Sequence, residues 1–152
     1  MYSISNINEE YAICNNEQHF KKLYCCNELS KRNTAHTAHK IFCIETEETV
    51  AGFPDVMETI TISAGSCTQA FFYEFKFSSK NGVIKFQPTQ PAFYKKNSEL
   101  PIKVVAYNNQ SKRVHVFSTN ELFNKESPYY IKKQNGVYAR IDLTLVEKEL
   151  GI

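Results

Sequence analysis

The segment from Gly52 to Lys76 places charged residues inside two runs of apolar and β-branched residues. Apolar alternation on both sides of the Ala64–Ser66 turn predicts a pair of strands. Glu74 and Lys76 are two positions apart, so on a strand their side chains point to the same face. Asp55 begins the preceding strand, where it can lie beside them. The segment therefore predicts two carboxylates and an amine that converge on one face of a sheet.

This cluster of charges favours a metal site over a packed core. A charge in the middle of an aromatic strand is unfavourable unless it is paired or metal-bound. Hard divalent cations prefer carboxylate oxygens and leave room for a substrate phosphate. The competing interpretation is a structural ion pair between Glu74 and Lys76 at a sheet edge. We favour the metal site because Pro54-Asp55 stands where that site requires a second carboxylate.

Pro54-Asp55 followed by Glu74-x-Lys76 resembles the PD-(D/E)xK nuclease superfamily. The stretch Gly82–Gln90 extends this likeness toward the VRR-NUC and Holliday-junction-resolvase-like (RecU-type) branch, in which a glutamine opens the helix after the Glu-x-Lys strand. The likeness covers residues 40–117. It implies an α/β fold with a restriction-endonuclease-like core, in which a central mixed sheet is flanked by helices.

The resemblance also implies roles for individual residues. Asp55 and Glu74 would hold Mg²⁺ or Mn²⁺, with help from the backbone carbonyl of Phe75. Lys76 would orient the attacking water and offset charge on the phosphate, and Gln90 would support that water or the lysine. The catalytic set is thus Asp55, Glu74, Lys76 and Gln90, and the products would carry a 5′-phosphate and a 3′-hydroxyl.

Related nucleases present a glutamate near the metal from an N-terminal helix. Glu17 and Glu28 are the candidates here, although a solvated helix face explains either one taken alone. Periodic apolar residues predict this helix within residues 8–33, broken at Asn15-Asn16, with Asn16 as the N-cap of its second part.

Basic residues near the predicted site are candidates for nucleic-acid contacts. The formal net charge is only +2, so local clusters must carry such a function. Lysines in a turn beside the site suit a phosphate backbone. The candidates are Lys40, Lys80, Lys85, Lys95 and Lys96. A second basic region, with Lys132, Lys133, Arg140 and the tyrosines 130 and 138, suits nucleic acid and a solvated hairpin equally well.

Further elements follow from local signals along the chain. Asn135-Gly136 between alternating runs predicts a C-terminal β-hairpin of residues 129–133 and 137–143. Strands are predicted at residues 40–45, 102–107 and 113–118, and helices at 88–97 and 144–150, with a short helical or turn segment at 121–123. The loop 78–90 leads into the first of these helices. Because a helix crosses between the Glu74 strand and residues 102–107, we expect those two strands to be parallel.

Length and composition predict one soluble globular domain spanning residues 1–152. The chain has 152 residues, of which 42% are hydrophobic and 22% charged. No apolar run approaches a membrane span, and the polar N-terminus is unlike a signal peptide. Its five cysteines lack disulfide or zinc spacing, so we expect reduced thiols in a cytoplasmic protein. His36 and His39 could bind a transition metal, but the sequence offers no convincing third ligand.

Together these features predict a metal-dependent DNA endonuclease of the junction- or flap-cutting kind. Two alternatives stay open: a nuclease of the same fold that acts on RNA or single strands, and a binding module that has lost turnover. We expect a homodimer by analogy, because symmetric cutting of two strands needs two sites.

Overall fold

The computed structural model describes residues 2–7, 9–29, 37–44, 52–62 and 68–152. Its strands are β1 (Ser3–Ile4), β2 (Thr37–Cys43), β3 (Val56–Ile62), β4 (Thr68–Phe77), β5 (Val83–Lys85), β6 (Ile102–Asn108), β7 (Arg113–Ser118), β8 (Lys132–Gln134) and β9 (Val137–Asp142). Its helices are α1 (Glu9–Ala12), α2 (Glu17–Tyr24), α3 (Thr89–Lys96) and α4 (Leu143–Glu149), with a π-helical turn at Cys25–Leu29 and a 3₁₀ turn at Thr119–Phe123.

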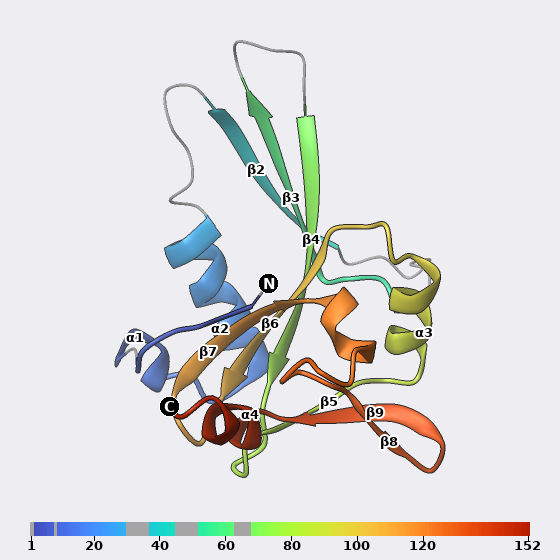
Figure 1. The fold of residues 1–152 in the computed structure, drawn as a ribbon. Coiled ribbons are helices and arrows are strands. Elements are labelled where there is room, and N and C mark those ends of the chain that lie inside the picture. Colours follow the sequence, from blue (N-terminus) through green and yellow to red (C-terminus); the bar gives the residue numbers. More distant parts are fainter. Residues whose placement is uncertain (1, 8, 30–36, 45–51, 63–67) are drawn as a thin grey trace.

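The fold is α/β, built on a mixed six-stranded sheet with the order β1-β7-β6-β4-β3-β2 (Figure 1). A second sheet has the order β5-β9-β8. Strand β4 pairs antiparallel with β3 and parallel with β6. This confirms the predicted parallel pair, whose crossover carries α3. Strand β4 is apolar on both faces because core clusters pack against both faces of the sheet.

Successive residues of the central strands divide the core into two clusters, one on each face of the sheet. Phe75, Val105 and Tyr107 pack with Phe20 of α2 on one face. The intervening residues Val104 and Ala106 pack on the other face, in the cluster that includes residues of α3, α4 and the smaller sheet. Glu74 and Lys76 lie opposite Val104 and Ala106 in the parallel register. Their side chains therefore share the face that carries α3.

The N-terminal helical region is broken where the sequence predicted. Asn16 precedes α2, and its side chain accepts a hydrogen bond of 2.8 Å from the backbone N–H of His19. The cap satisfies one of the free N–H groups of the first turn. The helix then places Phe20 and Tyr24 against Phe75 of the sheet.

The predicted C-terminal hairpin is present, with a shorter first strand than expected. Asn135 and Gly136 both have positive φ, 53° and 78°, as a tight hairpin turn requires. Strand β8 begins only at Lys132, because Tyr129 and Ile131 are fully buried in the core and do not pair with β9. A register shift between Lys132 and Lys133 accompanies this departure from the core.

Two other strand predictions need correction. Residues 83–85, predicted as part of a loop, form β5, which pairs with the distant strand β9. Strand β2 begins at Thr37 instead of residue 40, because its pairing with β3 continues to Ile62. The predicted turn at residues 64–66 lies outside the described residues. Among the described helices, none is long and apolar enough to cross a membrane.

Candidate active site

Strand β4 brings the predicted Glu74 and Lys76 together below the protein surface. Their side chains are only 5% and 12% exposed, and Lys76 Nζ lies 3.7 Å from Glu74 Oε1. The Phe86 ring lies beneath the ammonium group, 5.0 Å from Nζ to the ring centroid. The amine is therefore held between an aromatic face and a carboxylate, which limits the positions that its long side chain can take.

Asp55 lies beside this pair because the segment before β3 is fixed against α3. The Asp55 carboxylate accepts a hydrogen bond of 3.2 Å from the Phe75 backbone N–H. Gly52 has φ +87°, and a Cβ there would clash with the Thr89 carbonyl and with Phe93 of α3. The close approach of this segment to the helix thus depends on glycine.

Gln90 links Glu74 to Lys76 from the first turn of α3. Its Nε2 donates to Glu74 Oε1 over 2.6 Å, and its Oε1 accepts from Lys76 Nζ over 2.9 Å. The same oxygen accepts from the Gln87 backbone N–H at 2.9 Å. Two donors on Oε1 and an acceptor on Nε2 fix the orientation of the amide. The structure thus brings together the four residues predicted to be catalytic.

Glu74 is held in an environment that disfavours its ionised form. Burial raises the pKa of its carboxyl to about 8, and the nearby Asp55 adds to this, against the opposing effects of Lys76 and Gln90. Its second oxygen, Oε2, is buried and has no hydrogen-bond partner in the described part of the chain. Glu74 and Asp55 together face one ammonium group, that of Lys76, and a divalent cation bound at the free Oε2 would offset the excess negative charge.

Tyr94 also faces this cluster, and its role was not foreseen from the sequence. Its hydroxyl is buried without a hydrogen-bond partner among the described residues. Burial raises the pKa of this hydroxyl, and the charges of Glu74 and Asp55 raise it further. The signal that could have revealed it is helical spacing, because Tyr94 lies four positions after Gln90 on α3 and so shares its face.

The structure separates the two candidate N-terminal glutamates. The carboxyl of Glu17, at the start of α2, interacts electrostatically with Lys76 and Asp55: burial raises its pKa, Lys76 lowers it and Asp55 raises it. Glu28 instead lines a cavity of about 220 Å³ with Tyr11 and Tyr24, on the side of β1. Of the two, Glu17 is the acid with an electrostatic influence from Lys76 and Asp55.

The residues present fit a divalent cation, but they supply only part of a coordination shell. Asp55 and Glu74 offer carboxylate oxygens, whereas no group of three or more His, Cys, Asp or Glu residues within the described ranges could hold a metal. Mg²⁺ commonly binds through one or two carboxylates and keeps waters and substrate phosphate in its other positions. That the backbone carbonyl of Phe75 is a further metal ligand stays a prediction. His36 and the side chain of His39 lie outside what the structure describes.

The five lysines predicted to contact nucleic acid are exposed but do not form one surface. Lys85 ends β5, next to Phe86 of the site, and Lys95 and Lys96 end α3. Strand β2, which carries Lys40, belongs to the arm that extends away from the body, and the β4–β5 turn with Lys80 lies at the opposite end of β4 (Figure 1). Only Lys85, Lys95 and Lys96 lie on α3 or the smaller sheet.

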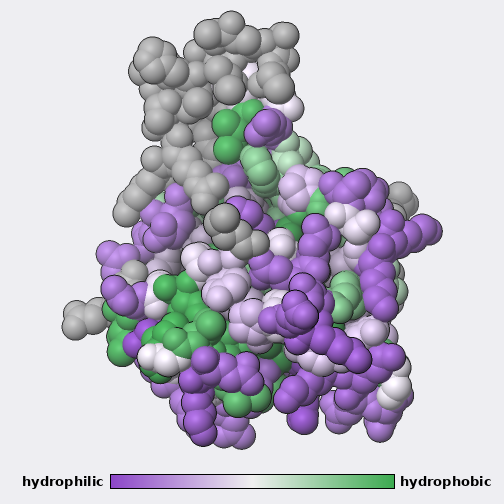
Figure 2. Space-filling model, in the orientation of Figure 1, coloured by the Kyte–Doolittle hydropathy of each residue, from purple (hydrophilic) through white to green (hydrophobic). Residues whose placement is uncertain are grey.

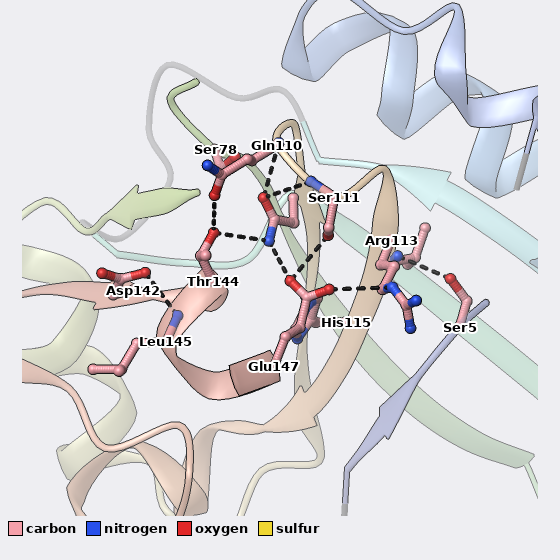
Figure 3. Close-up of polar contacts among 12 residues, drawn as sticks. Ser5, Ser78, Gln110, Ser111, Arg113, His115, Asp142, Thr144, Leu145 and Glu147 are labelled. Atoms are coloured by element: carbon pink, nitrogen blue, oxygen red, sulfur yellow. Dashed lines mark hydrogen bonds and ion pairs between the residues drawn. The ribbon is translucent and has the colours of Figure 1, made fainter. Parts of the chain in front are cut away.

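A second polar network, around Glu147 of α4, is distinct from the site (Figure 3). Glu147 accepts hydrogen bonds from Asn108 and Ser111, and its Oε1 lies 3.3 Å from Arg113 Nε. The fully buried His115 contacts both Glu147 and the Tyr129 hydroxyl. Burial lowers the pKa of His115 to about 4, so its ring is neutral at pH 7. These contacts dock α4 against β6 and β7, and we interpret the network as structural.

Comparisons with protein-family models, with curated proteins and with solved structures find no match to this chain.

Proposed function

We propose that this protein is a metal-dependent nuclease with a restriction-endonuclease-like core, which hydrolyses phosphodiester bonds in DNA. The observation that supports this most strongly is the Gln90 amide, which bridges Glu74 and Lys76 next to Asp55. A purely structural ion pair needs neither the bridge nor a second carboxylate. Each of these groups has a task when a phosphate and a cation enter the site.

The carboxylates of Asp55 and Glu74 would hold Mg²⁺ or Mn²⁺. A bound cation of this kind polarises the scissile phosphate and acidifies water at neutral pH. The Phe75 N–H orients Asp55, and Gln90 orients Glu74 through Oε1, so that the unpartnered Oε2 remains available to the cation. Both carboxylates are thereby preorganised before any substrate binds.

Lys76 is placed to act on the phosphate and on the attacking water. One N–H of Lys76 donates a hydrogen bond to Gln90 Oε1, which leaves its other N–H groups for oxygen atoms of the substrate or of water. A positive charge held at this point stabilises the negative charge that develops on the phosphate in the transition state. The charge of Glu17 acts on the same lysine from the start of α2.

The proposed substrate is DNA, with a junction or flap as the preferred structure and a homodimer as the active form. The test is cleavage by the purified protein of branched, duplex and single-stranded DNA and of RNA, in Mg²⁺, Mn²⁺, Ca²⁺ or EDTA. We expect cleavage of DNA in Mg²⁺ and Mn²⁺ only, and its loss in Asp55→Asn and Lys76→Ala. RNA cleavage alone would change the substrate, and cleavage in EDTA or by Asp55→Asn would overturn the proposal.

A further inference from the structure

Helix α3 presents Tyr94 to the interior of the protein. The two residues that follow it, Lys95 and Lys96, are exposed, and hydrophilic side chains cover much of the surface around the helix (Figure 2). Tyr94 itself is only 1% exposed and belongs to the core cluster on this face of the large sheet. Its ring makes edge contacts with Phe86 and Phe93. The side chain is therefore enclosed by protein.

These ring contacts do not explain the hydroxyl of Tyr94. A phenylalanine would make the same contacts, whereas the hydroxyl is buried without a hydrogen-bond partner among the described residues. An unpaired polar group in the interior lowers the free energy of unfolding, and most buried polar groups in folded proteins are paired. The hydroxyl is thus a donor whose acceptor has to be sought among its neighbours.

The charges that act on this hydroxyl are the two carboxylates of the candidate active site. Besides burial, the negative charges of Glu74 and Asp55 raise the pKa of Tyr94, and that of Glu74 contributes more. Gln90, one turn earlier on α3, already donates to Glu74 Oε1. The other oxygen, Oε2, is buried and has no hydrogen-bond partner within the described ranges. One unpaired donor and one unpaired acceptor thus belong to the same cluster.

A tyrosine hydroxyl and a cation can share one carboxylate oxygen, because each such oxygen offers two lone pairs. Hydrogen bonds to an ionised acceptor are roughly twice as strong as those between neutral groups. Carboxylates that bind metal ions are commonly held in place by hydrogen bonds of this kind. A hydroxyl at Oε2 would fix the orientation in which Glu74 meets a cation, as Gln90 fixes Oε1.

We propose that Tyr94 is a positioning residue, whose hydroxyl donates a hydrogen bond to Glu74 Oε2 when this carboxylate binds Mg²⁺ or Mn²⁺. This inference rests on the proposed nuclease function, which it deepens by adding a residue that governs metal affinity. Helix α3 then holds both oxygens of one metal ligand, Oε1 through Gln90 and Oε2 through Tyr94. In the metal-free protein the hydroxyl stays unpaired, so it contributes to metal binding and not to folding.

The test compares Tyr94→Phe with Tyr107→Phe, each of which deletes one oxygen atom. Tyr107 also has a buried hydroxyl without a hydrogen-bond partner in the described part of the chain, but its ring packs on the opposite face of the sheet, against Phe20 and Phe77. In EDTA both substitutions should raise the melting temperature by about 2–8 °C, because each removes an unpaired polar group.

Metal binding should distinguish the two variants. In a calorimetric titration, the affinity for Mn²⁺ should fall about 10–100-fold in Tyr94→Phe and keep the wild-type value in Tyr107→Phe. The Mg²⁺ concentration that gives half-maximal cleavage of DNA should rise by the same factor in Tyr94→Phe. Saturating Mg²⁺ should restore its cleavage rate, whereas added metal would not restore a rate lost through a disturbed core.

The outcomes separate this inference from the proposed function. Equal Mn²⁺ affinities of wild type and Tyr94→Phe, with cleavage intact, would overturn the role of Tyr94 and leave the nuclease in place. A wild type that neither binds Mn²⁺ nor cleaves DNA would overturn both. A Tyr94→Phe protein that is less stable than the wild type in EDTA would show that the hydroxyl has a structural partner, which also contradicts this role.

Discussion

Glu74→Gln should stabilise the metal-free protein while it abolishes cleavage. Glutamine keeps the size of the side chain and an oxygen that can accept from Gln90, but it removes the titrating carboxyl. The pKa of that carboxyl is raised from 4.5 to about 8 in the folded protein. A group whose pKa is raised by folding binds its proton more tightly in the native state. Its contribution to stability is therefore fully present below pH 4.5 and is lost as the pH rises toward 8.

The size of the effect follows from the shift. The unfolding free energy of the wild type should fall by about 3 kcal/mol between pH 4.5 and 7, and by about 4 kcal/mol by pH 8, relative to a protein without this carboxyl. Urea denaturation of wild type and Glu74→Gln in EDTA measures the difference as a function of pH. Glu99→Gln, which removes a carboxylate from the exposed surface, is the matched control.

The comparison distinguishes a functional carboxylate from a structural one. We expect the stability gap between Glu74→Gln and the wild type to widen as the pH rises, with no cleavage by the variant in Mg²⁺. If the two stability profiles run parallel, the electrostatic description of the site is wrong. If the variant is less stable at pH 8, Glu74 acts as a structural partner of Lys76. In either case the proposed metal site loses its main physical argument.

Three other substitutions test neighbouring parts of the account. Gln90→Ala should lower turnover by a factor on the order of 10²–10³, whereas Gln87→Ala should not, because Gln87 contributes its backbone N–H; steady-state kinetics would contradict this if the two defects were reversed. Because the folded-state pKa of His115 is lowered to about 4, the wild type should lose about 3 kcal/mol of unfolding free energy as the pH falls from 6.5 to 4, and His115→Gln should not. Urea denaturation would contradict this if the difference in unfolding free energy between wild type and variant stayed constant across that pH window. Gly52→Ala should lower the melting temperature and the cleavage rate together, because its φ and its contact with α3 exclude a Cβ; unchanged values would show that this contact does not position Asp55.

Local signals predicted the parts of the fold that depend on short stretches of sequence. Asn16 caps α2 because its side chain reaches an N–H three residues away, and Asn135-Gly136 turns the hairpin through its own backbone preference. The same-face relation of Glu74 and Lys76 follows from the period of a strand. These features need no knowledge of distant residues, and the sequence was sufficient for them.

Features that depend on distant partners could not be predicted. Residues 83–85 carry the turn-like neighbours Asn81-Gly82 and form a strand only because β9 supplies a partner. Likewise, Tyr94 reads as an ordinary inward-facing residue of α3 until the fold places Glu74 and Asp55 near it.

Calorimetric titration with Mn²⁺ at pH 7 tests the central claim most directly, because it reports on the cation without requiring a substrate. The wild type should bind Mn²⁺ and release close to one proton, since ligands must be deprotonated and the pKa of Glu74 is about 8. Titrations in buffers of different ionisation enthalpy measure that proton. Glu74→Gln should show neither the binding nor the proton release. Equal Mn²⁺ binding by wild type and variant would contradict the metal site.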